Sequence, residues 1–117
     1  MSYVDGFVAA VPNENKEKYI AHAKISALVL KENGALNVVE TWENDVSQGE
    51  ITSFPLAVQK KESESVIFSW VVWPSKTARD AGWKSYMEDP RMDPNKNPMP
   101  FDGKRLIYGG FTIIAEE

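Results

Sequence analysis

The sequence predicts an α+β protein with a ferredoxin-like βαββαβ arrangement, in which an antiparallel sheet carries two helices on one face. Three observations support this prediction. Four separated stretches are rich in strand-forming residues, two other stretches carry the spacing of amphipathic helices, and together they follow the order strand, helix, strand, strand, helix, strand. A chain of 117 residues has the length of one domain, and we expect residues 1–117 to form it.

The first half of the chain predicts a strand, a helix and a second strand. Residues 3–11 are rich in strand formers and stop at Pro12. A helical pattern follows, because Asn13 offers a capping side chain and Asn33–Gly34 is a typical helix end. Residues 35–43 are again rich in strand formers. The apolar stripe of the helix consists of Ile20, Ala23, Ala27 and Leu30.

The second half predicts the remaining three elements. We expect a weaker extended piece at residues 54–59, FPLAVQ, and with it an extra hairpin arm around residues 51–60. Residues 65–73, SVIFSWVVW, have the strongest strand pattern, and Ser75 then caps a helix to about Glu88. A loop with four prolines leads to the last strand, residues 105–114.

The last two predicted strands are apolar on both faces. In the stronger one a single polar residue, Ser69, interrupts the pattern. A sheet covered by helices on one side should instead alternate apolar and polar residues. We therefore expect a second copy of the chain to cover the helix-free face, which makes the protein a homodimer. The alternative is that the arm at 51–60 folds over this face. The two faces of the stronger strand carry Val66, Phe68, Trp70 and Val72 on one side and Ile67, Val71 and Trp73 on the other.

Composition excludes several classes of function. The chain has no cysteine and one histidine, His22, which excludes thiol chemistry, cysteine-bound metals and a multi-histidine metal centre. We predict no metal site and no cofactor, although an all-oxygen site or a single axial ligand stays open. A net charge of −4 without long basic runs argues against a nucleic-acid partner. The longest apolar run, VIFSWVVW, is too short to span a bilayer and no basic signal region begins the chain, so we expect a cytoplasmic protein without membrane contact.

Seven residues are candidates for ligand binding. In a ferredoxin-like sheet the last strand lies beside the first, which places Tyr108 and the pair Gly109–Gly110 near Asp5. Small residues there make room for a ligand, or equally for a bulge or for Phe68 and Trp70 on neighbouring strands. The seven candidates are Asp5, Glu40, Trp42, Trp70, Lys104, Arg105 and Tyr108.

Several of these candidates, and also His22, have both a functional and a structural interpretation. Lys104 and Arg105 suit a carboxylate or phosphate, yet pairing with Asp5, Asp89 or Asp102 is favoured. Glu40 and Trp42 share a strand face and suit a pocket for a flat aromatic compound, or simple packing. His22 is a general base, a haem ligand or only a residue on the border between the apolar and polar sides of its helix. The stretch Asp93-x-Asn95-x-Asn97 is not an EF-hand, because proline and lysine occupy its sixth and twelfth positions.

Five segments together resemble the YbaA-like family of small bacterial proteins of unknown function: YVDGF, GALNVVETWENDV, FSWVVWPSKTARD, DPRM and MPFDGKRLIYGGF. The likeness spans nearly the whole chain. It implies a dimeric α+β barrel, a superfamily that also holds antibiotic-biosynthesis monooxygenases, muconolactone isomerase and chlorite-dismutase-like haem proteins, and it assigns no catalytic residue. Two functions remain open, a binding protein or cofactor-free enzyme for an aromatic or acyl small molecule, and a non-enzymatic dimeric module with an interaction or stress-related role.

Overall fold

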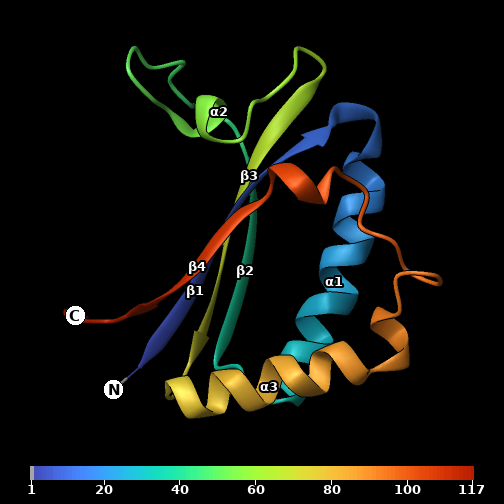
Figure 1. Cartoon of the computed structure of the whole chain (residues 1–117), viewed down its shortest axis with the longest axis vertical. Helices are drawn as coiled ribbons and strands as arrows, with labels where there is room; N and C mark the ends of the chain where they lie inside the picture. Colours follow the sequence, from blue (N-terminus) through green and yellow to red (C-terminus); the bar gives the residue numbers. More distant parts are fainter. Residues whose placement is uncertain (1) are drawn as a thin grey trace.

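The four main strands form one antiparallel sheet in the order β2-β3-β1-β4. The computed structural model describes residues 2–117. Helix α1 (Lys16–Glu32) lies along one side of the sheet, and α3 (Lys76–Glu88) crosses one end on that side (Figure 1). This arrangement confirms the predicted ferredoxin-like α+β fold. The strands are β1 (Tyr3–Pro12), β2 (Asn37–Trp42), β3 (Glu64–Trp73) and β4 (Ile107–Thr112), and the short helices are η1 (Asn13–Asn15), α2 (Phe54–Ala57), η2 (Pro90–Met92) and η3 (Gly103–Arg105).

The register of β1 fixes which side chains share a face. Strand β1 pairs with β3 on one side and with β4 on the other, so that Asp5 lies opposite both Val71 and Gly110. The predicted closeness of the first and last strands is therefore confirmed, since Gly6 faces Gly109 across the same pair of strands. Odd-numbered residues of β1 point to the helices and even-numbered ones to the opposite face.

The core lies between the sheet and α1. Ala9, Val11 and Ile67 of the sheet pack with Tyr19 and Ala23 of the helix. The buried stripe of α1 therefore includes Tyr19, which the sequence pattern did not place there. Of the predicted stripe, Ala23 and Leu30 are buried, whereas Ile20 and Ala27 lie at its margin.

The prediction of an extended piece at 54–59 is wrong. The side chain of Ser53 accepts a hydrogen bond from the Leu56 amide at 3.1 Å, which begins the one-turn helix α2. Pro55 fits the first turn of a helix, where its missing N–H costs nothing. The apolar residues of this stretch divide between the core, where Val58 is buried, and the surface.

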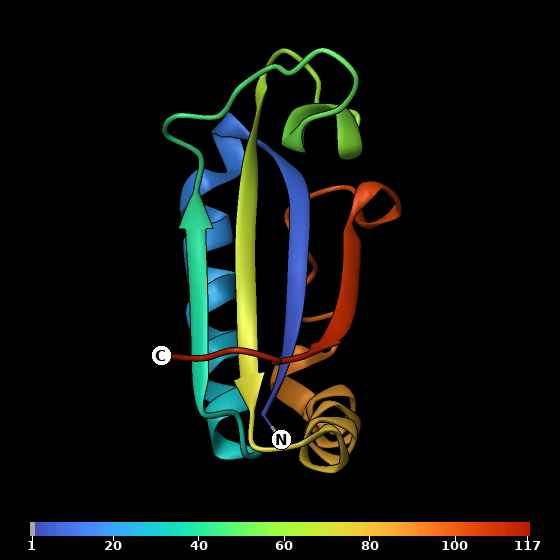
Figure 2. The ribbon, with the colours of Figure 1, turned by 90° about the vertical axis from the view of Figure 1, so that its left-hand side faces the viewer.

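The arm around α2 covers one end of the helix-free face. Val58 packs there with Val8, Ala10 and Val66. The alternative in which the arm folds over this face is thus correct for that end alone, and the sheet below the arm carries no helix (Figure 2). The apolar residues of the uncovered part are Val4, Val39, Phe68, Trp70, Val72, Ile107 and Phe111.

The last strand is shorter than predicted at both ends. Asp102 accepts a hydrogen bond from the Lys104 amide at 3.0 Å, so residues 103–105 form the 3-10 turn η3 before β4 begins at Ile107. At the other end, the Ile113 amide still bonds to the Ser2 carbonyl at 3.2 Å. The tail beyond it leaves on the helix-free side of the sheet (Figure 1), and the side chain of Ile114 is 90% exposed.

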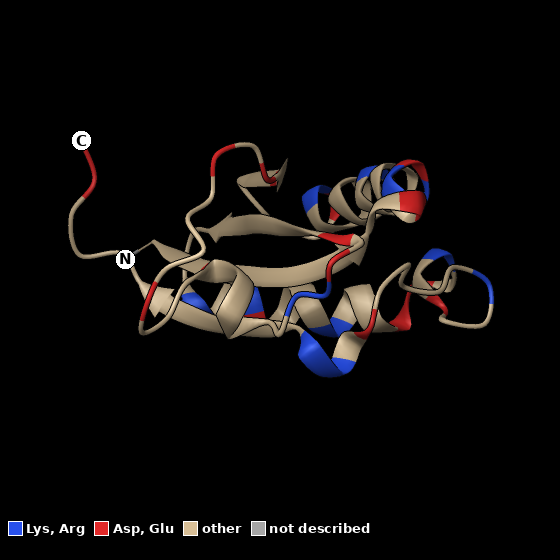
Figure 3. Ribbon diagram, turned by 90° about the horizontal axis from the view of Figure 1, so that it is seen from above, with Lys and Arg blue, Asp and Glu red and all other residues tan. Residues whose placement is uncertain are grey.

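Charged residues are nearly absent from the sheet. The four strands contain three of them, Asp5, Glu40 and Glu64, and all three are acidic. Lysines and arginines lie on the helices and loops, interspersed with acids (Figure 3). Within residues 2–117 no helix combines the length and the apolar character needed to cross a bilayer.

Candidate functional site

Asp5 is the centre of a buried hydrogen-bonded cluster. Asp5 is 3% exposed. Arg79 of α3 donates from Nε at 3.1 Å and from Nη2 at 2.8 Å to Oδ1. The indole Nε1 atoms of Trp73 and Trp83 donate to Oδ2 at 3.0 and 2.8 Å. A buried charge is stable only when it is paired and hydrogen-bonded, and here every donor comes from the protein itself.

The glycines near this cluster make room for its aromatic and cationic members. A Cβ on Gly110 would lie 2.7 Å from Cε2 of Tyr3 and 2.8 Å from Nη2 of Arg79. The guanidinium of Arg79 also lies over the Tyr3 ring, 5.2 Å from its centroid. On the opposite face, a Cβ on Gly109 would meet the Phe111 ring at 3.6 Å, an ordinary contact. The glycines therefore accommodate Tyr3, Arg79 and Phe111 rather than Phe68 and Trp70.

Arg105 fastens the loop before β4 to β3. Its guanidinium bonds both carboxylate oxygens of Glu64 at 2.7 Å and Oδ2 of Asp102 at 3.1 Å. The bond to Arg105 lowers the pKa of Glu64 to about 2. The structural interpretation of Arg105 is correct and Asp102 is one of its predicted partners, while Glu64 was not foreseen. Lys104 is exposed and makes no ion pair within residues 2–117.

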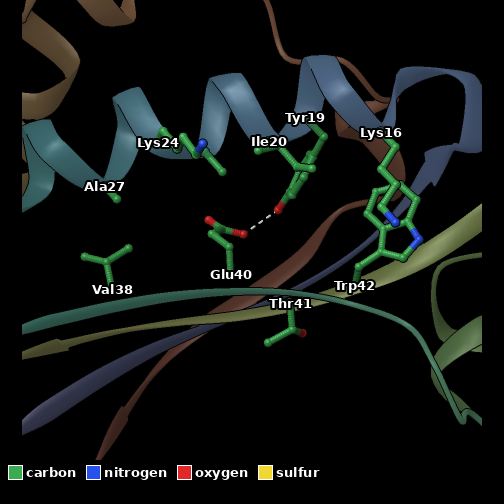
Figure 4. Close-up of a pocket in the computed structure, with 10 residues that line it drawn as sticks. Lys16, Tyr19, Ile20, Lys24, Ala27, Val38, Glu40, Thr41 and Trp42 are labelled. Carbon is green, nitrogen blue, oxygen red and sulfur yellow. Dashed lines mark hydrogen bonds between the residues drawn. The ribbon is translucent and has the colours of Figure 1, made fainter.

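Glu40 is the one strand acid without an ion pair among the described residues. Its carboxylate points beneath α1, where the hydroxyl of Tyr19 donates to Oε1 at 2.5 Å (Figure 4). Tyr19 is buried between the rings of Trp42 and Phe101. Glu40 as a residue lies at the sheet edge and keeps solvent contact, so its charge is only partly desolvated.

A groove of about 300 Å³ opens between α1 and β2 around this pair. The volume lies at the small end of the range for ligand sites. Glu40 and Tyr19 occupy the middle of the groove, and Trp42 with Lys16 forms one end, where the ammonium lies 5.3 Å from the centre of the indole ring (Figure 4). The other lining residues are Ile20, Ala23, Lys24, Ala27, Val38 and Thr41.

The surroundings of the pair disfavour its charged forms. Burial raises the pKa of Glu40, and the hydrogen bonds from Tyr19 and Ser69 oppose this only in part. Burial, followed by the nearby charge of Glu40, raises the pKa of Tyr19. Tyr19 therefore keeps its proton and donates it in the hydrogen bond to Glu40, and Glu40 is the one carboxyl in the lining, with a pKa above its ordinary value.

The structure separates the seven predicted ligand residues into different places. Glu40 and Trp42 meet in the groove, whereas Asp5 is enclosed by its own donors. Trp70 lies on the helix-free face beside Phe68. Tyr108 is 74% exposed at the sheet edge, stacked on Phe7. Lys104 and Arg105 belong to the loop described above.

Two residues important to these clusters were not among the candidates. Tyr19 lies four residues before Ala23, so the helical stripe could have included it. Arg79 has no comparable signal, because its partner lies 74 residues away. His22, which was a candidate base, is partly buried in α1 and burial lowers its pKa. In residues 2–117 no three acidic or histidine side chains gather closely enough to hold a metal ion.

Comparison with known proteins shows a family without an assigned function. Residues 2–103 match the family model described as "Protein of unknown function (DUF1428)". Among curated proteins, the uncharacterized protein YbaA of Escherichia coli strain K12 is 51% identical over 117 residues and is covered completely, as is this chain. The YbaA of Shigella flexneri matches equally well.

Solved structures share the fold at low sequence identity. An uncharacterized NIPSNAP-like domain protein from Burkholderia xenovorans superposes with a TM-score of 0.62 at 11% identity, over 99% of this chain and 88% of that one. A variant of SnoaB, a cofactor-independent oxygenase from Streptomyces nogalater, gives a TM-score of 0.52 at 16% identity, over 98% of this chain and 93% of that one. At these identities the likeness concerns the fold alone.

Proposed function

The chain belongs to the DUF1428 family, the YbaA-like proteins, and we propose that it binds a small organic molecule in the groove between α1 and β2. A single observation carries this proposal. Of the three acids in the sheet, Asp5 and Glu64 each have an arginine, whereas Glu40 has only the neutral hydroxyls of Tyr19 and Ser69 and faces a groove with apolar walls. An acid of this kind, in the middle of an apolar groove, is typical of ligand and catalytic sites.

The groove supplies the parts of a binding site with acid–base capacity. The apolar walls of the groove consist of Ile20, Ala27 and Val38. At its centre the Glu40 carboxylate accepts a hydrogen bond from the Tyr19 hydroxyl. Because its pKa is raised above the ordinary value of a carboxyl, Glu40 is a stronger base than an ordinary carboxylate toward a bound molecule. A cofactor-free reaction on an aromatic or acyl compound is therefore within the chemistry of these side chains. The fold shared with a cofactor-independent oxygenase is compatible with it.

Filling the groove tests this proposal. Ile20→Trp inserts a large ring into the groove from a partly exposed helix position, and Ile25→Trp makes the same change outside it. A panel of neutral and anionic aromatic and acyl compounds is screened by thermal shift, and the affinity of each hit is measured by calorimetry. We expect Ile20→Trp to weaken binding at least about tenfold and Ile25→Trp to leave it unchanged. Absence of hits, or equal effects of both changes, would refute the groove as the binding site.

We also propose that the uncovered part of the helix-free face pairs with a second copy of the chain. Trp70 and Val72 of β3 and Phe111 of β4 are only partly covered there, and the tail carrying Ile114 leaves on the same side (Figure 2). This contiguous apolar surface lies between the arm around α2 and the C-terminal tail, and it suits a contact in which two sheets pack face to face. The non-enzymatic dimeric module remains the alternative if this face forms a dimer and the groove binds nothing.

Native mass spectrometry measures this association directly. We expect twice the mass of one chain for the wild type and a single chain for Trp70→Glu or Phe111→Glu, since a charge at the centre of an apolar interface remains unpaired. Met87→Glu serves as the control, because Met87 is 75% exposed on α3, away from that face. A wild-type monomer at micromolar concentration would overturn the dimer.

A further inference from the structure

The charges around the groove are unbalanced in favour of cations. Lys16 and Lys24 line it, and neither lies in an ion pair among residues 2–117. They stand eight residues apart on α1, about 12 Å along the helix, with the Glu40–Tyr19 pair between them. Glu40 is the one acid in the lining, and its contact with Tyr19 already engages one of its oxygens.

The two lysines have different surroundings. The ammonium of Lys16 lies over the indole of Trp42, a contact that holds it at that end of the groove. Lys24 lies on α1 between Ile20 and Ala27, at the end of the groove away from Trp42 (Figure 4). A negative group bound beside Ile20 therefore finds a free ammonium at Lys24, and the rest of the ligand finds apolar side chains.

We infer that the groove takes a small aromatic carboxylate that also carries a hydroxyl group. Its carboxylate pairs with Lys24, its ring lies on the apolar wall formed with α1, and its hydroxyl donates to the carboxylate of Glu40. This inference rests on the proposed binding function and names its ligand class. The charge of Lys24 selects an acid over its amide, because an ammonium attracts a carboxylate more strongly than a neutral carbonyl. Glu40 favours a ligand with a donor, because its own oxygens accept.

Three probe compounds separate the contributions of the carboxylate and the hydroxyl. They are 4-hydroxybenzoate, its neutral amide 4-hydroxybenzamide, and benzoate, which lacks the hydroxyl. Calorimetry on the full chain at low salt should give the tightest binding for 4-hydroxybenzoate, with the amide and benzoate each weaker by about threefold to tenfold. Because an exposed ion pair is screened, binding of the two acids should weaken as salt rises, while binding of the amide should not.

A lysine substitution shows whether the preference comes from the groove. Lys24→Gln should weaken binding of 4-hydroxybenzoate about threefold to tenfold and leave the amide unchanged. Lys18→Gln removes the same charge from an exposed position of α1 outside the groove and should change neither. Both positions are exposed, so folding is expected to be unaffected.

The outcomes distinguish failure of this inference from failure of the proposed function. Equal binding of acid and amide, or loss of both with Lys24→Gln, would overturn the carboxylate class while leaving the groove as a binding site. Binding of neutral compounds alone would do the same. If the acids bind but Ile20→Trp does not affect them, they bind elsewhere, and both the ligand class for this groove and the proposed function fail. A complete absence of binding also overturns both.

Discussion

Replacing Gly82 by alanine should destabilise the protein, although glycine to alanine in a helix usually does the opposite. Gly82 is buried in α3 with an ordinary helical backbone. A Cβ there would lie 2.5 Å from Cη2 of Trp73 and 2.9 Å from the carbonyl oxygen of Asn33. The Trp73 ring is 0% exposed and its Nε1 bonds to Asp5 at 3.0 Å, so the ring has no free space into which to move.

Two opposing terms set the size of the effect. Alanine in a helix interior is favoured over glycine by about 1 kcal/mol. Overpacking of a well-filled core costs about 1 to 3 kcal/mol, and the close contacts with a fixed ring and a backbone oxygen place Gly82 at the upper end. The net expected loss is therefore about 2 kcal/mol in the free energy of unfolding, or roughly 8 °C in the melting temperature for a chain of this size.

Urea denaturation at a fixed protomer concentration measures this loss. Ala81→Gly, at the neighbouring exposed position of α3, should lower the free energy of unfolding by about 1 kcal/mol. Opposite substitutions at these two adjacent positions should therefore both destabilise the protein. In a Trp73→Phe background, which lacks the obstructing ring atoms, Gly82→Ala should cost less, and the difference gives the coupling between the two sites. A Gly82→Ala protein as stable as the wild type would refute the reasoning.

Three further results are expected. Tyr19→Phe removes a hydrogen bond that lowers the pKa of Glu40, so this pKa should rise further in an NMR titration of the carboxyl carbon, and an unchanged value would contradict the assigned contact. The pKa of Glu64 is lowered in the fold to about 2, so its contribution to stability is complete above its unfolded pKa near 4.5 and is lost as the pH falls toward 2. Glu64→Gln should therefore flatten the pH dependence of the melting temperature between these two values. An unchanged slope would show that other carboxyl groups cause this dependence. Gly110→Ala should lower the melting temperature clearly and Gly109→Ala little, because only the first meets side chains closer than 3 Å, and equal effects would disprove this difference.

The order of the strands and helices follows from local features of the sequence. Alternation in residues 65–73 and the stops at Pro12 and Asn33–Gly34 lie within a few residues of the elements that they define. The fold class then places the last strand beside the first, whereas the register that pairs Gly6 with Gly109 comes from the structure. The arm was misread because its apolar spacing imitates a strand, whereas the local cap at Ser53 determines its structure.

Half of the candidate site could be predicted from the sequence in the same way. Glu40 and Trp42 share a face because strand side chains repeat every two residues. Their partner Tyr19 was missed, because the helical pattern alone leaves the exact rotation of α1 undetermined. Arg79 lies 74 residues from Asp5 and Glu64 lies 41 residues from Arg105, and no spacing rule connects residues at such separations.

The hydrogen bonds of Asp5 have a consequence for how the chain reaches its folded state. This carboxylate stands near the N-terminus, and its donors lie 68 to 78 residues later along the chain. During synthesis β1 cannot bury this charge until Trp73, Arg79 and Trp83 have all emerged from the ribosome. Strand β1 is therefore expected to fold stably only after α3 has been synthesised, and the sheet and α3 are expected to form in one late, cooperative step.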